Sequence, residues 1–231
     1  MNSVAQNLAD VREAIASAAR RADRNPQNVR LVAVSKTHPA SAVEDAAKAG
    51  QRIFGESRVQ EARDKIPACP AGLEWHFIGH LQKNKVRHAL PLFSFFHSID
   101  SAELASAMDR IAGETGRAVE GLLEINVSGE ATKHGFSPDA LRAEFASLAA
   151  LPNLRLRGLM TMAPYSENPE AARPVFRALR ELRDELQKMH GTPLPDLSMG
   201  MSGDFEPAIE EGSTLVRIGT AIFGERPAPP Q

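Results

Sequence analysis

Apolar segments of strand length alternate with segments of helical character along almost the whole chain, and this alternation constrains the fold more than any other feature. Eight strands are predicted, at residues 30–35, 52–55, 75–78, 93–99, 119–127, 154–162, 197–199 and 215–218. Each of the first seven precedes a predicted helix, at residues 39–50, 57–66, 82–90, 100–116, 137–150, 168–190 and 204–211. Strict alternation is typical of repeated β-α-β units, and strands that are apolar on both faces favour a parallel sheet covered by helices.

Eight such units predict one closed (β/α)8 barrel of the TIM type, and the whole chain, residues 1–231, is interpreted as a single domain. The alternative is an open, doubly wound sheet. The leading segment, residues 1–26, contains an extra helix at residues 3–24, where apolar residues recur at helical spacing. The last residues, 225–231, are expected to form a frayed end.

Side chains that can cap helices mark two of the predicted helix starts. Asp100 follows the fourth strand, and Ser137 stands directly before Pro138 and Asp139. Such side chains accept hydrogen bonds from the exposed N–H groups of a first helical turn, and proline is tolerated at the first helical position. We therefore predict that Asp100 and Ser137 are N-caps.

Composition and charge narrow the class of protein. The chain is 42% hydrophobic and 24% charged, as in an ordinary globular protein. Its net charge of −2 does not favour binding to nucleic acid or to an anionic membrane surface. Its single cysteine, Cys69, excludes an internal disulfide and a cysteine metal cluster. The N-terminus lacks the pattern of a secretory signal, and no apolar run approaches the roughly 20 residues that cross a bilayer. We predict a cytoplasmic protein.

Lys36 directly follows the first predicted strand. In a parallel barrel, functional groups collect where strands end and the following loops begin, so this side chain is expected at the barrel mouth. One interpretation is an ordinary surface lysine. The other is an amine that forms a Schiff base with an aldehyde, since partial desolvation and nearby cations lower the pKa of a lysine and make it nucleophilic.

Two short motifs that contain glycine lie at the ends of the last two strands: SMGMSGD at the end of the seventh and RIGT at the end of the eighth. Small residues let backbone N–H groups approach an anion, while Ser202 and Thr220 add hydroxyl donors and the helix predicted near Asp204 adds a favourable dipole. The loops after strands seven and eight are the recurrent phosphate site of this barrel. We predict a phosphate site there, with two ordinary turns as the alternative.

Arg217 lies inside an otherwise apolar strand. A buried arginine needs partners, and either an ion pair with Glu124 or Glu56, or contact with a ligand, would provide them. Closure of the barrel would make the last strand the neighbour of the first and bring Arg217 beside Lys36. In an open sheet the two could lie far apart.

The seven histidines show no HExxH or similar metal-binding spacing, so no metal is predicted. His38 and His80 lie near strand ends, where they could contact a ligand or be structural or solvated. His76 lies within a strand and is predicted to be a hydrogen-bonded core residue. Lys133, in the loop after the fifth strand, is either a second amine for a ligand or simply exposed.

Seven ordered motifs resemble the YggS/PROSC family of pyridoxal phosphate-binding proteins, also called PLP homeostasis proteins, and they cover nearly the whole chain. The motifs are LVAVSKTHP at 31–39, FGESRVQE at 54–61, WHFIGHLQKNK at 75–85, INVSGEATKHGF at 125–136, LRGLMTMAP at 156–164, LSMGMSGDFEPAIEEGST at 197–214 and VRIGTAIFG at 216–224. The resemblance implies a barrel similar to that of alanine racemase and pyridoxal 5′-phosphate (PLP) as cofactor.

By that resemblance, Lys36 holds the position of the lysine that bears PLP, and Arg217 the position of the arginine that faces the pyridine nitrogen. Ser202, Gly219 and Thr220 occupy the phosphate-binding positions.

Two further cofactor-site positions depart from the related proteins. Ser57 stands where the family usually has asparagine, and a serine can still donate a hydrogen bond. Met162 stands where alanine racemase has a histidine, which removes a polar contact with the cofactor.

The resemblance implies a PLP carrier in intracellular PLP (vitamin B6) homeostasis, without strong catalytic activity and with apo PLP-dependent enzymes as candidate partners. One alternative is an amino-acid racemase, which needs an acid or base on each face of the substrate carbon. Lys36 could serve one face, and Tyr165 is the single tyrosine available for the other. A Schiff-base aldolase that uses Lys36 without a cofactor is a third possibility. We expect a monomer.

Overall fold

The structure is a computed structural model that describes residues 3–130 and 133–225. The predicted frayed end therefore lies outside the described residues, except for Glu225. Eight parallel strands form the centre of the molecule: β1 (Arg30–Val34), β2 (Ile53–Glu56), β3 (Glu74–Phe77), β4 (Phe95–Ile99), β5 (Val119–Glu124), β6 (Leu154–Met160), β7 (Asp196–Ser198) and β8 (Leu215–Ile218).

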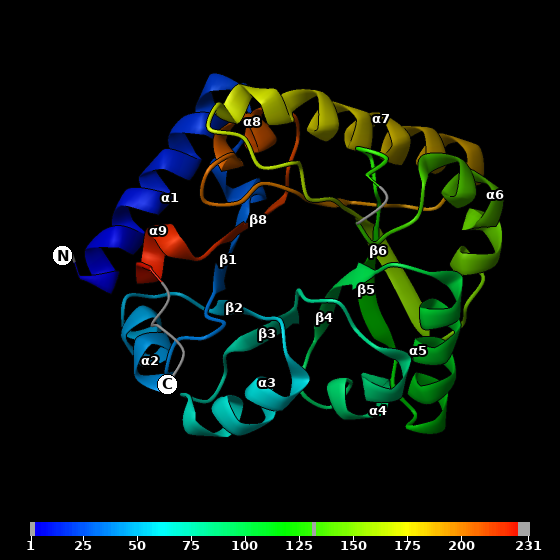
Figure 1. Ribbon diagram of the computed structural model, residues 1–231, viewed down its shortest axis with the longest axis horizontal. Helices are drawn as coiled ribbons and strands as arrows, with labels where there is room; N and C mark the ends of the chain where they lie inside the picture. Colours follow the sequence, from blue (N-terminus) through cyan, green and yellow to red (C-terminus); the bar gives the residue numbers. More distant parts are fainter. Residues whose placement is uncertain (1–2, 131–132, 226–231) are drawn as a thin grey trace.

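The strands close into a barrel in sequence order, because the last strand pairs with the first. Arg30 to Ala33 of β1 run parallel to Leu215 to Ile218 of β8 in continuous register. The predicted (β/α)8 barrel is confirmed, and the open-sheet alternative is wrong. Figure 1 shows β8 and β1 side by side although they come from opposite ends of the chain.

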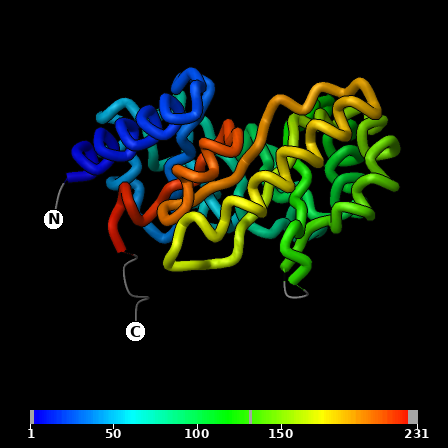
Figure 2. The backbone as a smooth tube through the Cα atoms, turned by 90° about the horizontal axis from the view of Figure 1, so that it is seen from above, coloured from blue at the N-terminus to red at the C-terminus, as the bar shows by residue number. Residues whose placement is uncertain are grey.

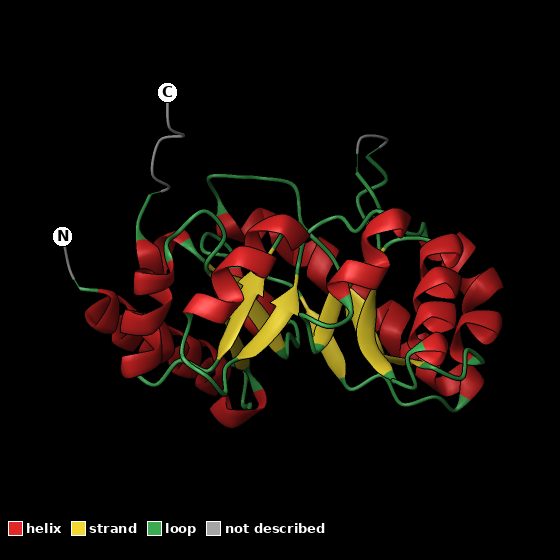
Figure 3. Cartoon of the chain, turned by 90° about the horizontal axis from the view of Figure 1, so that it is seen from below, coloured by secondary structure: helices red, strands yellow, loops and turns green. Residues whose placement is uncertain are grey.

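Helices surround the barrel, and Figure 3 shows them on both sides of the strands. They are α1 (Val4–Arg21), α2 (Ala40–Lys48), α3 (Val59–Lys65), α4 (Val86–Ala89), α5 (Ala102–Glu114), α6 (Pro138–Ala149), α7 (Arg173–His190), α8 (Phe205–Glu210) and α9 (Thr220–Phe223). Short 3-10 turns cover Pro26–Asn28, Ile66–Ala68, Lys83–Lys85 and Pro169–Ala172. Within the described residues, no helix has the length and apolar character that a bilayer crossing requires.

The predicted helices are present, but the bounds of several elements differ from those predicted. The helix predicted at 82–90 is a 3-10 turn, Lys83–Lys85, followed by α4. β8 is followed by the short helix α9, which the sequence analysis did not predict. β5 ends at Glu124 instead of residue 127, and the next residue, Ile125, forms an isolated bridge with the loop residue Phe136.

The predicted cap at Ser137 is confirmed, since its side chain accepts a hydrogen bond from the N–H group of Ala140. The predicted cap at Asp100 is wrong. Ser101 has the extended backbone conformation of an N-cap, and its hydroxyl oxygen accepts from the N–H group of Leu104. The helix therefore begins one residue later than predicted, and the carboxylate of Asp100 is available for other contacts.

The core has two layers. The larger layer lies between the strands and the helices, and it includes Phe54, Phe77 and Leu123. The smaller layer fills the barrel interior with five buried apolar side chains: Val32, Phe95, Leu122, Met160 and Leu215. The barrel is therefore packed below its mouth, and ligand-sized space is expected only where the strands end.

The leading helix α1 packs beside the last part of the chain. It contacts α2, α8 and α9, and Figure 2 shows this N-terminal helix next to the C-terminal segments. The side-chain amide of Asn7 donates to the carbonyl oxygen of Ile222 at 2.9 Å, and Arg24, just after α1, donates to the carbonyl oxygen of Ser213 at 2.8 Å. Helix α1 thus supports the loops that follow β7 and β8.

Candidate functional site

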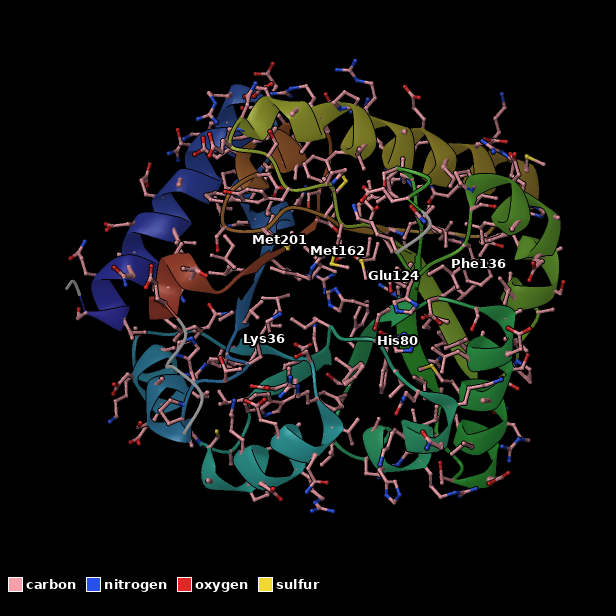
Figure 4. The ribbon with its side chains drawn as sticks, in the orientation of Figure 1. Lys36, His80, Glu124, Phe136, Met162 and Met201 are labelled. Atoms are coloured by element: carbon pink, nitrogen blue, oxygen red, sulfur yellow. The ribbon has the colours of Figure 1, made fainter. Side chains whose placement is uncertain are left out.

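A cavity of about 310 Å³ opens at the carboxyl ends of β1, β6, β7 and β8. Six of the seven predicted site residues line it: Lys36, Met162, Ser202, Arg217, Gly219 and Thr220. Figure 4 shows Lys36, Met162 and Met201 around this part of the barrel mouth. Barrel closure therefore brings the amine from the first strand end, the arginine of the last strand and the glycine-containing loops to one place.

Ser57 lies apart from the other predicted site residues. It lines a second cavity of about 400 Å³, together with Arg58 and His80. Gly79 packs directly on Ser57, and a Cβ atom at Gly79 would come within 2.2 Å of the carbonyl oxygen of Ser57. Contact between Ser57 and the cofactor stays a prediction.

A tight turn after β1 positions Lys36. The N–H group of His38 donates to the carbonyl oxygen of Ser35 at 3.0 Å, and Thr37 has a φ of 69°, which is rare for a residue other than glycine. The N–H group of Thr37 donates to a carboxylate oxygen of Glu61 at 2.6 Å. Both neighbours of Lys36 are thereby held, and its half-buried side chain lines the cavity.

A buried ionic cluster lies beneath this turn. The ammonium group of Lys65 lies 2.9 Å from a carboxylate oxygen of Glu56 and 2.7 Å from one of Glu61, and it also donates to the carbonyl oxygen of Ser35 at 2.9 Å. The Glu56 side chain is fully buried and accepts from the Ser35 hydroxyl at 2.7 Å. Burial raises the pKa of Glu56, and the adjacent Lys65 opposes this shift. The cluster ties the ends of β1 and β2 to α3.

Arg217 is 5% exposed and points into the barrel mouth. Its guanidinium group donates to the carbonyl oxygen of Thr161 at 3.0 Å and to the hydroxyl oxygen of Ser198. Within residues 3–130 and 133–225, neither Glu124 nor Glu56 forms an ion pair with Arg217, so that predicted alternative is wrong. Burial lowers the pKa of Arg217 to about 10, which leaves the guanidinium group protonated at neutral pH.

Glu124, at the end of β5, interacts electrostatically with Arg217. Burial, with a contribution from the nearby carboxylate of Asp100, raises the pKa of Glu124 to about 7. The positive charge of Arg217 acts in the opposite direction.

Polar side chains continue from Arg217 into the barrel interior. The hydroxyl group of Ser198 lies 2.7 Å from Nδ1 of His97, whose Nε2 lies 2.9 Å from Nδ1 of His76. Nε2 of His76 lies 2.8 Å from a carboxylate oxygen of Glu74. Burial, supported by the charges of His76 and Arg217, holds the pKa of His97 well below its usual value. The predicted role of His76 as a hydrogen-bonded core residue is confirmed, whereas the sequence analysis did not identify His97.

The loops after β7 and β8 form the opposite wall of the cavity. Gly200 has a φ of 93°, and its carbonyl oxygen accepts from the N–H group of Arg217 at 3.0 Å. Gly219 lies against β1, where an added Cβ atom would come within 3.2 Å of the carbonyl oxygen of Val34. The hydroxyl-bearing residues Ser202 and Thr220 line the same wall. This set of donors suits a phosphorylated ligand.

Asp204, His38 and Tyr165 also line the cavity. The sequence analysis treated Asp204 only as the start of a helix, although its place in SMGMSGD is a signal for a loop-capping carboxylate. It accepts from the N–H group of Met201 at 2.6 Å, and burial raises its pKa. His38 stacks on Phe223 at a centroid distance of 5.2 Å, and Tyr165 is 93% exposed.

Sequence comparisons identify the family. The family model described as "Alanine racemase, N-terminal domain" matches residues 6–227. The pyridoxal phosphate homeostasis protein of Aquifex aeolicus is 47% identical over 222 residues, which is 96% of this chain and 97% of that protein. This chain belongs to the family of pyridoxal phosphate homeostasis proteins. The member from Escherichia coli K12 is 45% identical over 234 residues, with 98% of each chain covered.

Solved structures agree with this assignment of family and fold. PipY of Synechococcus elongatus without PLP is 40% identical and superimposes with a TM-score of 0.87, over 96% of this chain and 100% of PipY. PipY with PLP bound superimposes with a TM-score of 0.84 over the same shares of the two chains. An alanine racemase of Clostridium difficile 630 shares the fold at 16% identity and a TM-score of 0.73, over 98% of this chain and 57% of the racemase.

Proposed function

We propose that this protein binds PLP as a Schiff base on Lys36 and acts in intracellular PLP homeostasis without strong catalytic activity. The observation that carries the proposal is the shared cavity of Lys36, Arg217 and the two glycine-containing loops. The relatives named PLP homeostasis proteins, and PipY with PLP bound, support it.

The residues of the cavity fit the chemical groups of PLP. Lys36 provides an amine for the aldehyde, and Ser202 and Thr220 provide hydroxyl donors for the phosphate. Gly219 lies so close to β1 that a larger residue would crowd the wall. Met162 and Val34 provide apolar surface for the flat ring. Each part of the cofactor thus has a matching group in one cavity.

The covalent link requires no further reactant. The ε-amine nitrogen of Lys36 would add to the aldehyde carbon, a carbon–nitrogen double bond would form, and the aldehyde oxygen would leave as water. The turn at Thr37, whose N–H group is hydrogen-bonded to Glu61, limits the movement of Lys36. Such fixation lowers the entropy that the amine loses on reaction.

Weak catalysis follows from the partner that we expect at the ring nitrogen. PLP promotes reactions by accepting electron pairs into its ring, and a carboxylate partner strengthens this property. Arg217 stays protonated at neutral pH and can only donate a hydrogen bond. The ring nitrogen would therefore stay unprotonated and accept electrons poorly.

A racemase also needs a second acid or base, opposite Lys36. Tyr165 lines the cavity, but its side chain is 93% exposed, so the structure around it does little to hold it in place for proton transfer. This observation favours the carrier over the racemase. Delivery of PLP to apo-enzymes, a cytoplasmic location and a monomeric state stay predictions from the sequence.

The absorption spectrum of the purified protein tests the proposal directly. With added PLP we expect a visible band, and borohydride reduction should fix the label on the peptide that contains Lys36. Lys36→Ala should abolish the band, while Lys133→Ala is the matched control, because Lys133 is a second amine at the mouth whose ammonium group pairs with Glu130 at 2.8 Å. A label found only on another lysine would contradict the assignment.

Two further assays separate the alternatives. Loss of α-deuterium from alanine, dependent on Lys36, would support a racemase and contradict the proposed weak activity. Faster activation of an apo-enzyme by the loaded protein than by an equal concentration of free PLP would support delivery. Schiff-base aldolase activity that persists in fully PLP-free protein would support the third alternative.

A further inference from the structure

A second cluster of reactive side chains lies at the barrel mouth, apart from the cavity of Lys36. It consists of His80, Asp100 and His134, which follow β3, β4 and β5 respectively. One potential ligand atom from each residue lies within 4.8 Å of the other two. Figure 4 shows His80 beside Glu124 on this side of the mouth, away from Lys36. Three consecutive strand ends thus converge, and this is the end of the barrel where functional groups collect.

The contacts inside the cluster centre on Asp100. Its Oδ2 atom lies 2.8 Å from Nδ1 of His80 and 4.0 Å from Nδ1 of His134. The two imidazole rings stack at a centroid distance of 4.1 Å and an angle of 15°. Both histidines thus present a ring nitrogen to the same carboxylate oxygen.

Burial and a second hydrogen bond restrain the carboxylate of Asp100. Its side chain is only 9% exposed, and its second oxygen, Oδ1, accepts from the Ser101 hydroxyl at 3.2 Å. Ser101 is the N-cap of α5, so its own position is fixed by that helix. A carboxylate oriented by a second hydrogen bond is typical of groups that bind metal ions.

A buried acidic side chain, Glu124, interacts with the cluster. Glu124 is 6% exposed, and its side chain has no hydrogen-bond or ion-pair partner among the residues that the structure describes. The charges of Asp100 and His80 act on it directly. The ligand atoms of the site itself therefore come from Asp100 and the two imidazoles, which lie within 4.8 Å of one another.

We propose that His80, Asp100 and His134 bind a divalent transition-metal ion, with Zn²⁺ as the best match. Two imidazole nitrogens and one carboxylate oxygen are the ligand types that Zn²⁺ accepts, and three protein ligands leave one coordination position for water or a substrate atom. Mg²⁺ and Ca²⁺ prefer all-oxygen sets and are excluded as the preferred ion.

The site needs only a small adjustment to close around the ion. Two ligands of one Zn²⁺ ion lie at most about 4.2 Å apart, since each bond is about 2.1 Å long. The ligand atoms of the cluster all lie within 4.8 Å of one another, which is close to this value. The side chain of His134 is 61% exposed, so its ring can rotate toward Asp100 without disturbing the core. Asp100 itself can stay where it is.

Calorimetric titration of the purified full chain with ZnCl₂, in a buffer that does not chelate metal, tests the site. We expect one ion per chain, and substitution of any ligand (His80→Ala, Asp100→Asn or His134→Ala) should weaken binding at least about tenfold. His88→Ala is the matched control, because His88 is an exposed histidine on α4 outside the cluster. Co²⁺ should produce a visible absorption band in the wild type and the control that is missing in the ligand variants.

Two outcomes would overturn the site. Absence of Zn²⁺ binding by the wild type would mean that the cluster is only a hydrogen-bonded pair of His80 and Asp100. Equal binding by all variants would place the ion elsewhere. Circular dichroism of each variant shows whether it is folded. PLP binding, measured on the same samples, reports on Lys36 separately, so this proposal and the proposed function can fail independently.

Discussion

Lys36 and Arg217 line one cavity although they come from opposite ends of the chain, because β1 pairs directly with β8. The first residue provides an amine in a restrained turn, and the second a buried guanidinium group hydrogen-bonded to Ser198 and Thr161. A ligand that bridges them is bound only by the closed barrel.

Arg217→Met should weaken PLP binding while leaving the fold intact. The variant loses hydrogen bonds to a charged donor, each worth about 1.5–3 kcal/mol, so we expect about a tenfold to hundredfold weaker affinity. The substitution also leaves the buried Thr161 carbonyl and Ser198 hydroxyl without their donor, so the unfolding free energy should fall by about 1–3 kcal/mol while the protein stays folded. Absorption titration and thermal unfolding measure the two effects. Unchanged affinity would exclude Arg217 as a cofactor contact.

Thr220→Val should distinguish PLP from pyridoxal, which has the same ring and aldehyde but no phosphate. Thr220 lines the wall formed by the loops after β7 and β8, where we expect the phosphate. Loss of one hydrogen bond to a charged group should weaken PLP binding by about tenfold or more and leave pyridoxal binding unchanged. Titration with both compounds provides the comparison, and an equal loss for both would place the phosphate elsewhere.

Lys65→Met should destabilise the fold and loosen the turn that carries Lys36. The substitution removes the partner of the fully buried Glu56, and isolating a buried charge costs about 3–5 kcal/mol. Chemical denaturation measures the loss. Lys48→Met serves as control, because Lys48 pairs with Glu44 on the surface, and it should cause no measurable change.

A second substitution separates the charge effect from a packing effect. Adding Glu56→Gln to Lys65→Met removes the isolated charge, so part of the lost stability should return. No recovery in the double variant would show that Lys65 acts through packing alone.

Acid should destabilise the protein through His97. Burial holds the pKa of His97 well below 6.5, so the folded state keeps it neutral while the unfolded chain binds a proton below about pH 6.5. Since the unfolded state binds more protons, the unfolding free energy falls as the pH decreases below about 6.5. His97→Gln should remove this part of the pH dependence, and the surface variant His88→Gln should not. Denaturation curves measured between about pH 5 and 7, the range in which histidine side chains usually titrate, provide the test.

Some interpretations from the sequence could be made because their signals are local. The alternation of strands and helices, the cap at Ser137 and the positions of Lys36 and Thr220 at strand ends depend on neighbouring residues. One prediction was wrong for an equally local reason. Asp100 and Ser101 are both good caps, and only the backbone conformation of Ser101 decides between them.

The order of the elements, the class of the fold and the residues at the strand ends can be predicted from the sequence, because hydrophobic period and turn chemistry act over a few residues. The structure was needed to show that β8 pairs with β1 and that Arg217 contacts Ser198 instead of Glu124. It was also needed to show that Ser57 lines another cavity and that His80, Asp100 and His134 converge. Such meetings depend on strand order, register and the path of each loop, and no short stretch of sequence encodes them.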